Sequence, residues 1–472
     1  MKYLKLLPPA VFICLHAVSA GAQIVWPART FAPYVDMNND PAPSLPDFAH
    51  QSGQRFYAAA FVISDLTQSA TGAPAGIPAW GGQTDCSVRS GYLASQFAQL
   101  RAMGGDVRVS FGGEAGTELA EYIPNIASLT AAYQSVIDQY SLTQVDFDIE
   151  GKTLDDQASV NRRSAAIKQL QTTASNGGKT LNVWLTLPVE PAGMPPDSIY
   201  AVESALKAGV TLAGINIMTM DFGDAAAPRP KGMMGSYAIA SATSACAQLQ
   251  ALYRSQNIAL SGTQLWGMLG ITPMIGVNDN ETEVFTLPDA WQVVNWARQQ
   301  GVGYLGYWSE GRDAASKGAE LGRISSNRSG ISQPPHAFAE IFETFQGGNP
   351  PPRRSRYKLH ISGTDAAAGS AALIVGSAEN AALAGRLPDG QLFSATGGIE
   401  SGAGGSCFPV NEVLNYPFTV PKNSKGSLVG NLIFTGSTSL SGTLEWTKPE
   451  QKSGKNRPAA NATLTVTGSN LP

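Results

Sequence analysis

A short apolar run, a loop and a helix-like stretch follow one another repeatedly between about Ile24 and Gln346. Each apolar run has the length of a buried parallel strand. The eight runs are 31–35, 56–63, 107–111, 145–149, 183–187, 215–220, 266–271 and 304–308. Helix-like stretches between them include 91–103, 126–140, 157–173 and 289–300. Strands that alternate with helices in this way predict an α/β fold, a (β/α)8 TIM barrel.

A doubly wound open sheet would give a similar alternation of strands and helices. In that fold an early strand is often followed by a Gly-x-Gly-x-x-Gly turn, which binds a dinucleotide phosphate. No such turn follows the early apolar runs. The sequence therefore favours the closed barrel over the open sheet.

The chain changes character after the barrel region. Residues 347–355 are rich in proline and are typical of a stiff linker. Beyond them, short strand-like runs lie between Gly, Ser, Asn and Pro turns, at 357–361, 372–375, 428–434, 443–446 and 462–466. We expect residues 356–472 to form a small all-β accessory module, a sandwich.

The N-terminus has the pattern of an export signal. Lys2 and Lys5 flank an apolar stretch, 6–18, that ends in small residues. Such a segment is typical of a cleaved signal peptide, here 1–22, and is too short for a lasting membrane anchor. We therefore expect a secreted protein, extracellular or periplasmic, whose catalytic domain covers 23–346.

An oxidising compartment changes how the cysteines are interpreted. Cys86, Cys246 and Cys407 remain after signal removal, which is an odd number. Cys86 and Cys246 fall in the same expected domain, and whether they pair stays open. If they pair, Cys407 is left alone.

Composition excludes several classes of function. The chain has 36 acidic and 32 basic residues, a net charge of −4, which argues against a general attraction to nucleic acid or acidic membranes. A neutral substrate fits better. Its four histidines lie apart from Cys, Asp and Glu clusters, so we expect no metal, no cofactor and no Ser-His-Asp triad. We expect a monomer.

The run 145–151, Val-Asp-Phe-Asp-Ile-Glu-Gly, carries the strongest chemical signal. Side chains alternate faces along a strand, so Asp146, Asp148 and Glu150 point to one side. In a barrel they would rise through the interior to the mouth, where active sites lie. A solvated edge strand or a calcium site are alternatives, but the intervening hydrophobic residues favour a buried strand, and the further spaced oxygen donors of a calcium loop are absent.

Four stretches in order resemble the motifs of glycoside hydrolase family 18, the chitinase family. The run 143–150 is similar to its Asp-Gly-x-Asp-x-Asp-x-Glu signature, and 110–113 to its Ser-x-Gly-Gly motif. The stretch 218–221, Met-Thr-Met-Asp, resembles its Met-x-Tyr-Asp motif, and 307–309 its Trp-ending eighth strand. Two signature positions differ, Thr143 and Gln144, and Met220 replaces the tyrosine that binds the acetamido group of the substrate.

The resemblance implies a retaining mechanism in which the N-acetyl oxygen of the substrate is the nucleophile. Glu150 would be the general acid, Asp148 would hold the acetamido group, and Asp146 would share a proton with Asp148. For substrate binding it points to Asp221 and Met218 of the Met-x-Tyr-Asp motif, and to Trp308 and Tyr34, although these two aromatics could also be packed core residues. Trp80 is either an outer sugar platform or a loop anchor.

By this resemblance the expected function is hydrolysis of β-1,4-linked N-acetylglucosamine polymers, with the polysaccharide as the partner. The alternatives are a weak or inactive chitin-binding barrel, and an endo-β-N-acetylglucosaminidase acting on glycans or peptidoglycan. A third alternative places the function in 356–472, as an adhesin or binding module. That segment has one tryptophan, Trp446, so a spacer role is as well supported as carbohydrate binding.

Overall fold

The computed structural model describes residues 24–65 and 76–346. In the C-terminal part it describes the segments 356–362, 369–375, 380–388, 392–398, 400–402, 405–415, 425–434, 439–448 and 460–470. The expected signal peptide, 1–22, and the expected linker, 347–355, lie outside the described residues.

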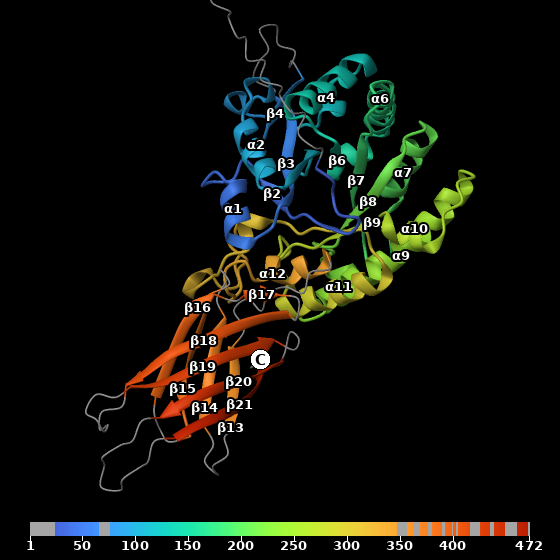
Figure 1. The fold of residues 1–472 in the computed structure, drawn as a ribbon. Coiled ribbons are helices and arrows are strands. Elements are labelled where there is room, and N and C mark those ends of the chain that lie inside the picture. The colour runs from blue at the N-terminus through green and yellow to red at the C-terminus, as the bar shows by residue number, and fades with distance from the viewer. Residues whose placement is uncertain are drawn as a thin grey trace, which may run out of the picture.

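Parallel strands in the first part pair side by side in one sheet, and several of them are labelled in Figure 1. In order they are β1 (Thr30–Phe31) with β2 (Tyr34–Asp36), β3 (Phe56–Asp65), β5 (Asp106–Gly112), β6 (Gln144–Asp148), β7 (Asn182–Pro188), β8 (Leu212–Met218), β9 (Leu269–Thr272) and β12 (Tyr304–Leu305). β1 pairs with β12 and β2 pairs with β3, both in parallel. The ring thus closes through the N-terminal strand.

Pro33 divides that first strand into two assigned pieces. Proline has no N–H to donate to a neighbouring strand, but its carbonyl still accepts from Ala58 N–H at 2.9 Å. Ala32 N–H donates to Leu305 O at 3.0 Å on the other side. β1 and β2 therefore act as one barrel strand, and the predicted (β/α)8 barrel is confirmed.

Helices cover the outside of the ring. The longer ones are α1 (Leu45–Ser52), α2 (Ala94–Ala102), α4 (Ile126–Tyr140), α6 (Gln157–Asn176), α7 (Pro196–Lys207), α9 (Met234–Ser255) and α11 (Leu287–Gln300). Local sequence sets their ends: Asn125 caps α4 by accepting from Ser128 N–H at 3.0 Å, and Gly301, at φ 81°, ends α11. Across the described residues, no helix combines the length and the apolar character needed to cross a membrane.

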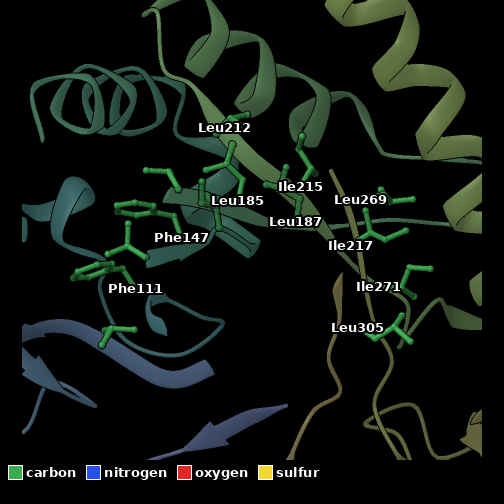
Figure 2. Packing of buried hydrophobic residues seen from close by; sticks show 14 of the residues in the cluster. Phe111, Phe147, Leu185, Leu187, Leu212, Ile215, Ile217, Leu269, Ile271 and Leu305 are labelled. Carbon is green, nitrogen blue, oxygen red and sulfur yellow. The ribbon is translucent and has the colours of Figure 1, made fainter. Parts of the chain in front are cut away.

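The apolar residues of the strands face these helices (Figure 2). Phe111 of β5 and Phe147 of β6 stack at 5.1 Å between ring centroids, and Tyr133 of α4 packs edge-on against both. All three are at most 1% exposed. Burial of side chains of this size stabilises the fold by about 1.5–3 kcal/mol each, and it fixes the opposite face of each strand toward the barrel interior.

The floor of the barrel is built around a buried arginine. The Arg108 guanidinium carbon lies 4.6 Å from the ring centroids of both Trp184 and Tyr304. A Cβ at Gly214 would lie 2.3 Å from the Trp184 ring, and one at Gly270 would lie 2.5 Å from the Tyr304 ring. Glycine on β8 and β9 therefore makes room for the two rings that enclose the guanidinium.

The seventh and eighth strands are shorter than predicted. Ser261 begins a helix, α10 (Gly262–Gly267), through a capping box with Gln264, so Trp266 is helical and β9 starts at Leu269. The prediction of a strand from residue 266 was wrong, because a short apolar run does not distinguish a strand from a buried helix.

The C-terminal part is one antiparallel sheet rather than the expected sandwich. Its strands are β13 (Arg356–Ser362), β14 (Gly369–Val375), β15 (Asn380–Arg386), β16 (Leu392–Gly398), β17 (Glu400–Gly402), β18 (Gly405–Asn415), β19 (Lys425–Phe434), β20 (Ser439–Lys448) and β21 (Ala460–Asn470). They pair in the order β16-β15-β14-β13-β21-β20-β19-β18-β17. β16 also contacts β18, so the sheet curls and encloses alternate residues such as Tyr357, Leu359 and Ile361.

Cys86 and Cys246 do not form a disulfide. Cys86 lies in a single 3-10 turn (Thr84–Cys86), and Cys246 lies on α9. Both are free thiols, and Cys246 is buried. The question that the sequence left open is thus settled against pairing between these two residues.

Candidate active site

A cleft of about 720 Å³ opens at the C-terminal ends of the barrel strands. Residues at or just beyond the ends of β2, β5, β6, β7, β8 and β9 contribute to its walls. Tyr34, Asp148, Glu150, Met218, Asp221 and Trp308, all expected site residues, line it. Asp146, the remaining one, lies below them in the interior and is fully buried.

Asp146 is held by three hydroxyl groups from three different strands. Its Oδ2 accepts from Ser110 Oγ at 2.6 Å and from the Tyr34 hydroxyl at 2.8 Å, and its Oδ1 accepts from Thr186 Oγ1 at 2.7 Å. Burial raises the pKa of Asp146, while Arg108 and these hydroxyls act in the opposite direction. Hydrogen bonds donated to a carboxylate favour its ionised form.

A second layer of polar groups holds those hydroxyls. The Asn216 side-chain amide lies 3.2 Å from the Tyr34 hydroxyl and 3.1 Å from Thr186 Oγ1, and its Oδ1 accepts from Thr272 Oγ1 at 2.9 Å. Sequence reasoning missed Thr186, Asn216 and Thr272. The signal was one polar residue at an inward position of each otherwise apolar strand.

Asp148 differs from Asp146 in having an unsatisfied oxygen. Its side chain is at least nine-tenths buried, at 4% exposure, yet Oδ1 has no hydrogen-bond partner among the described residues. Burial, followed by the charges of Glu150 and Asp146, raises the pKa of Asp148 well above its usual range. Three hydroxyls donate to Asp146 and no described group donates to Oδ1 of Asp148, so a proton resides on Asp148 more readily than on Asp146.

Glu150 lies beyond the end of the strand and not within it. β6 ends at Asp148, and Glu150 has an extended backbone at the N-cap of the short helix α5 (Gly151–Asp155). Burial, then the charges of Glu114, Asp221 and Asp279, raises the pKa of Glu150 to about 7. A carboxyl group with this pKa holds a proton near neutrality and can give it up, as a general acid must.

Two glycines allow the end of β5 and the residue after it to lie against β6. A Cβ at Gly112, where φ is 100°, would lie 2.1 Å from the Asp148 carbonyl oxygen. The Gly113 N–H donates to the same oxygen at 3.0 Å. The Ser-x-Gly-Gly stretch therefore supports the backbone of Asp148, in addition to supplying Ser110.

Trp308 forms an aromatic floor together with a residue that sequence reasoning missed. It stacks on Phe61 with 5.5 Å between ring centroids and an interplanar angle of 15°, and Tyr34 lies 6.3 Å from it. Trp308 is half-buried and lines the cleft. Trp80 is different: it is fully buried in β4 (Ile77–Trp80) and donates to the Tyr140 hydroxyl at 2.9 Å, so the platform interpretation was wrong.

The sixth strand supplies the opposite wall. Met218 and Met220 line the cleft, and Asp221 accepts from Asn280 N–H at 2.8 Å. The Asp221 side chain opens to the cleft, but enclosure by the cleft walls raises its pKa to about 6, against the lowering effect of that hydrogen bond and with a further contribution from Asp279. The thioether of Met220 cannot donate a hydrogen bond.

Among the described residues, no three or more His, Cys, Asp and Glu side chains are arranged to hold a metal ion. The chemistry that these side chains can perform is proton transfer. One carboxyl group with a pKa near 7 lies at the mouth, one carboxyl group with a raised pKa lies below it, and one carboxylate is held by hydroxyls at the bottom.

Comparison with known proteins identifies relatives of this chain. No family model matches the sequence. Over 320 residues it is 35% identical to a probable bifunctional chitinase/lysozyme of Escherichia coli (strain K12), which covers 68% of this chain and 35% of that protein. Over 288 residues it is 34% identical to endochitinase 11 of Metarhizium anisopliae, covering 61% and 53% respectively. The chain thus spans between about a third and a half of these curated relatives.

A solved structure extends the match to a whole catalytic domain. The catalytic domain of a hyperthermophilic chitinase from Pyrococcus furiosus is 30% identical, with a TM-score of 0.59, and the match covers 68% of this chain and 96% of that domain. Active-site variants of the same chitinase have been solved with chito-oligosaccharides, at the same identity and TM-score. This chain belongs to glycoside hydrolase family 18, the chitinase family.

Proposed function

We propose that the chain is a chitinase that hydrolyses β-1,4-linked N-acetylglucosamine polymers with retention of configuration. The observation that carries the proposal is the pair formed by Glu150, whose pKa is raised to about 7, and Asp148, which lines the cleft and whose buried Oδ1 has no partner among the described residues. One group can donate a proton, and the other can receive a polar group of the sugar.

In the first step Glu150 donates its proton to the glycosidic oxygen. The bond between that oxygen and the anomeric carbon breaks, and its electron pair stays with the leaving oxygen. The carbonyl oxygen of the 2-acetamido group on the same sugar attacks the anomeric carbon from the opposite face and forms an oxazolinium ion. The protein therefore needs no carboxylate nucleophile of its own.

Asp148 orients the acetamido group during this step. Its free Oδ1 accepts the acetamido N–H, which points the carbonyl oxygen at the anomeric carbon. The positive charge that develops lies next to Asp148 and Asp146, and Asp146 is kept in place by Ser110, Tyr34 and Thr186. Groups fixed before the reaction stabilise developing charge without reorganising.

In the second step Glu150 acts as a base. Water attacks the anomeric carbon, gives its proton to the Glu150 carboxylate, and the oxazolinium ring opens to regenerate the acetamido group. Two inversions at the same carbon leave the product in the β configuration. Trp308 supports the reacting sugar, because the apolar face of a pyranose packs on an aromatic ring.

The relatives support this substrate class. Two are described as a chitinase/lysozyme and an endochitinase, and a third binds chito-oligosaccharides. We further propose that the protein is exported, on the basis of the N-terminal pattern. Detection of the protein only in the cytoplasm of a producing bacterium would contradict export.

The test of the proposal is Glu150→Gln. The amide keeps the shape and cannot donate the required proton, so we expect hydrolysis of soluble chito-oligosaccharides to fall by about 10²–10⁴-fold, with binding retained. Glu203→Gln, on the outer surface of α7 where Glu203 pairs with Lys207, is the matched control and should behave as wild type. Full turnover by Glu150→Gln would disprove the assignment.

The anomeric form of the first product gives a second test. NMR of fresh product should detect the β anomer. An initial α product would contradict substrate assistance and indicate direct attack by water.

A further inference from the structure

The charge lining the cleft is of one sign. Its lining residues include seven carboxylic acids and, within the described part of the chain, no Lys, Arg or His. The acids are Asp36, Glu114, Asp148, Glu150, Glu190, Asp221 and Asp279. The pKa values of Asp148 and Glu150 are raised, so the negative charge of the cleft near neutrality comes chiefly from the other five acids.

The acids surround the cleft. Asp36 ends the first barrel strand, and Glu114, Glu190 and Asp279 follow the third, fifth and seventh. In an eight-stranded ring the first and fifth strands lie opposite each other, as do the third and seventh. A sugar chain crossing the mouth therefore meets carboxyl groups on every side of the reacting position, wherever it enters and leaves.

These carboxyl groups are not neutralised by the protein. None of the seven takes part in an ion pair among the described residues. Arg312 interacts electrostatically with Asp221 and Asp279, but it is buried, it is not a lining residue of the cleft, and it donates to the carbonyl oxygens of Ile275 and Val277. Glu114, Glu190 and Asp279 are exposed to solvent.

Asp148 is an independent indication that a ligand with a donor group enters the cleft. It lines the cleft, and its buried Oδ1 has no hydrogen-bond partner among the described residues. An unsatisfied buried oxygen costs about 1–3 kcal/mol, and a donor on the bound sugar removes that cost. The cleft thus offers hydrogen-bond acceptors and negative charge to a ligand. None of its lining residues in the described part of the chain is a cation.

We propose that this cleft prefers partially N-deacetylated chitin, in which some sugars carry a 2-ammonium group, over fully acetylated chitin, and that it disfavours peptidoglycan. This inference rests on the proposed function. The reacting sugar must keep its N-acetyl group, because the acetamido oxygen is the nucleophile. The flanking sugars carry the ammonium groups, and the muramic acid carboxylate of peptidoglycan is repelled by the same charges.

Three soluble substrates of equal length test the proposal: fully acetylated chitohexaose, hexamers of mixed glucosamine and N-acetylglucosamine, and glycan strands from peptidoglycan. At low salt, each ammonium group should raise kcat/KM by about two- to fivefold, the effect of one partly screened ion pair. Salt at about 0.5 M should remove the difference, because it screens exposed charges. Mass spectrometry should find N-acetylglucosamine at the new reducing end.

Glu190→Gln is the variant of choice. Glu190 is exposed, and it is not among the groups that raise the pKa of Glu150, so its removal leaves the acid unchanged. The ratio of kcat/KM between mixed and fully acetylated hexamers should fall by about two- to fivefold. Glu203→Gln, outside the cleft, should leave both rates and their ratio unchanged.

The outcomes separate this inference from the proposed function. Equal, salt-independent kcat/KM for the mixed and acetylated hexamers, or equal cleavage of peptidoglycan strands, would overturn the charge preference while chitinase activity stands. Failure to cleave any of them would overturn the proposed function. The affinity of the Glu150→Gln variant for each hexamer, measured by tryptophan fluorescence, then tests the charge preference without turnover. Equal affinity for the mixed and the fully acetylated hexamer would overturn the preference.

Discussion

The hydroxyl of Tyr34 lies 2.8 Å from Oδ2 of Asp146, although 112 residues separate them along the chain. The contact joins the first barrel strand to the fourth through the interior. It leaves the Tyr34 ring between the carboxylates below and Trp308, at 6.3 Å, above. The same residue thus holds Asp146 and borders the floor on which we place the reacting sugar.

Tyr34→Phe should reduce turnover without unfolding the protein. The substitution removes one of three hydroxyl donors to Asp146, and hydrogen bonds to charged groups contribute about 1.5–3 kcal/mol. We expect kcat on a chito-oligosaccharide to fall by about tenfold to a hundredfold, with a small change in KM. Tyr253→Phe, which removes a buried hydroxyl on α9 that has no partner among the described residues, is the control. Equal kcat in the two variants would refute the role of Tyr34.

Activity should decline as pH rises through about 7. In the proposed mechanism Glu150 acts in its protonated form, and burial among other carboxyl groups raises its pKa to about 7. We expect kcat/KM to fall about tenfold per pH unit well above that value. A pH profile on a neutral hexamer at constant ionic strength is the measurement. A decline in kcat/KM that begins at pH 5, or no decline up to pH 9, would be inconsistent with Glu150 as the acid.

Glu150 should also lower stability at alkaline pH. Its pKa rises from 4.5 to about 7 on folding, so the folded state binds its proton more tightly than the unfolded chain. Its contribution to stability is therefore present below pH 4.5 and is lost as pH rises through 7. Thermal unfolding should give Glu150→Gln and wild type similar Tm values at pH 4, and a higher Tm for the variant at pH 8. A difference in Tm between the variant and wild type that does not change with pH would contradict this explanation.

Met220→Tyr should increase the rate. The hydroxyls of Tyr34, Thr186 and Thr272 line the cleft, and each already donates within the barrel network. A tyrosine at this position would add a donor for the acetamido carbonyl, and one neutral hydrogen bond contributes about 1 kcal/mol, or roughly fivefold in kcat/KM. Met220→Phe separates the ring from the hydroxyl. An equal rise in both variants would show that the hydroxyl is not responsible.

Gly214→Ala should destabilise the barrel. The added Cβ would lie 2.3 Å from the Trp184 ring and 2.5 Å from the Met268 carbonyl oxygen, so either the ring or the backbone must move. We expect a loss of about 1–3 kcal/mol in the free energy of unfolding, measured with urea. The control is Gly262→Ala in α10, where no described atom outside the adjacent residues and the helix's own backbone lies within 4 Å of the new Cβ. A loss of the same size in both variants would contradict the packing explanation.

The barrel could be predicted from the sequence because the hydrophobic pattern of its strands and helices is periodic. Apolar runs of strand length recur between helices, and the alternation along 145–149 predicted which side chains of β6 face inward; the structure has Asp146 buried below the cleft and Asp148 at its wall. The ends of elements were less predictable. Trp266 belongs to a helix because Ser261 and Gln264 cap its start, a local contact that hydrophobicity alone does not report.

The polar network and the cleft charge could not be predicted in the same way. Thr186 and Asn216 become partners of Tyr34 only when their strands stand next to each other in the ring. Phe61 stacks on Trp308 from 247 positions away along the chain, and nothing near either residue indicates the pairing. Trp80 was ambiguous for the same reason, since its partner Tyr140 is distant in sequence.

The three carboxyl groups of β6 and its loop are synthesised by residue 150, but the groups that make them useful come later. Thr186 and Asn216 follow, and Trp308 is nearly the last part of the barrel to be made. The ring closes only when β12 pairs with β1. On the proposed function, hydrolysis therefore begins only after the whole barrel has folded: a nascent or partly folded chain that already contains Glu150 lacks the complete site until β12 pairs with β1.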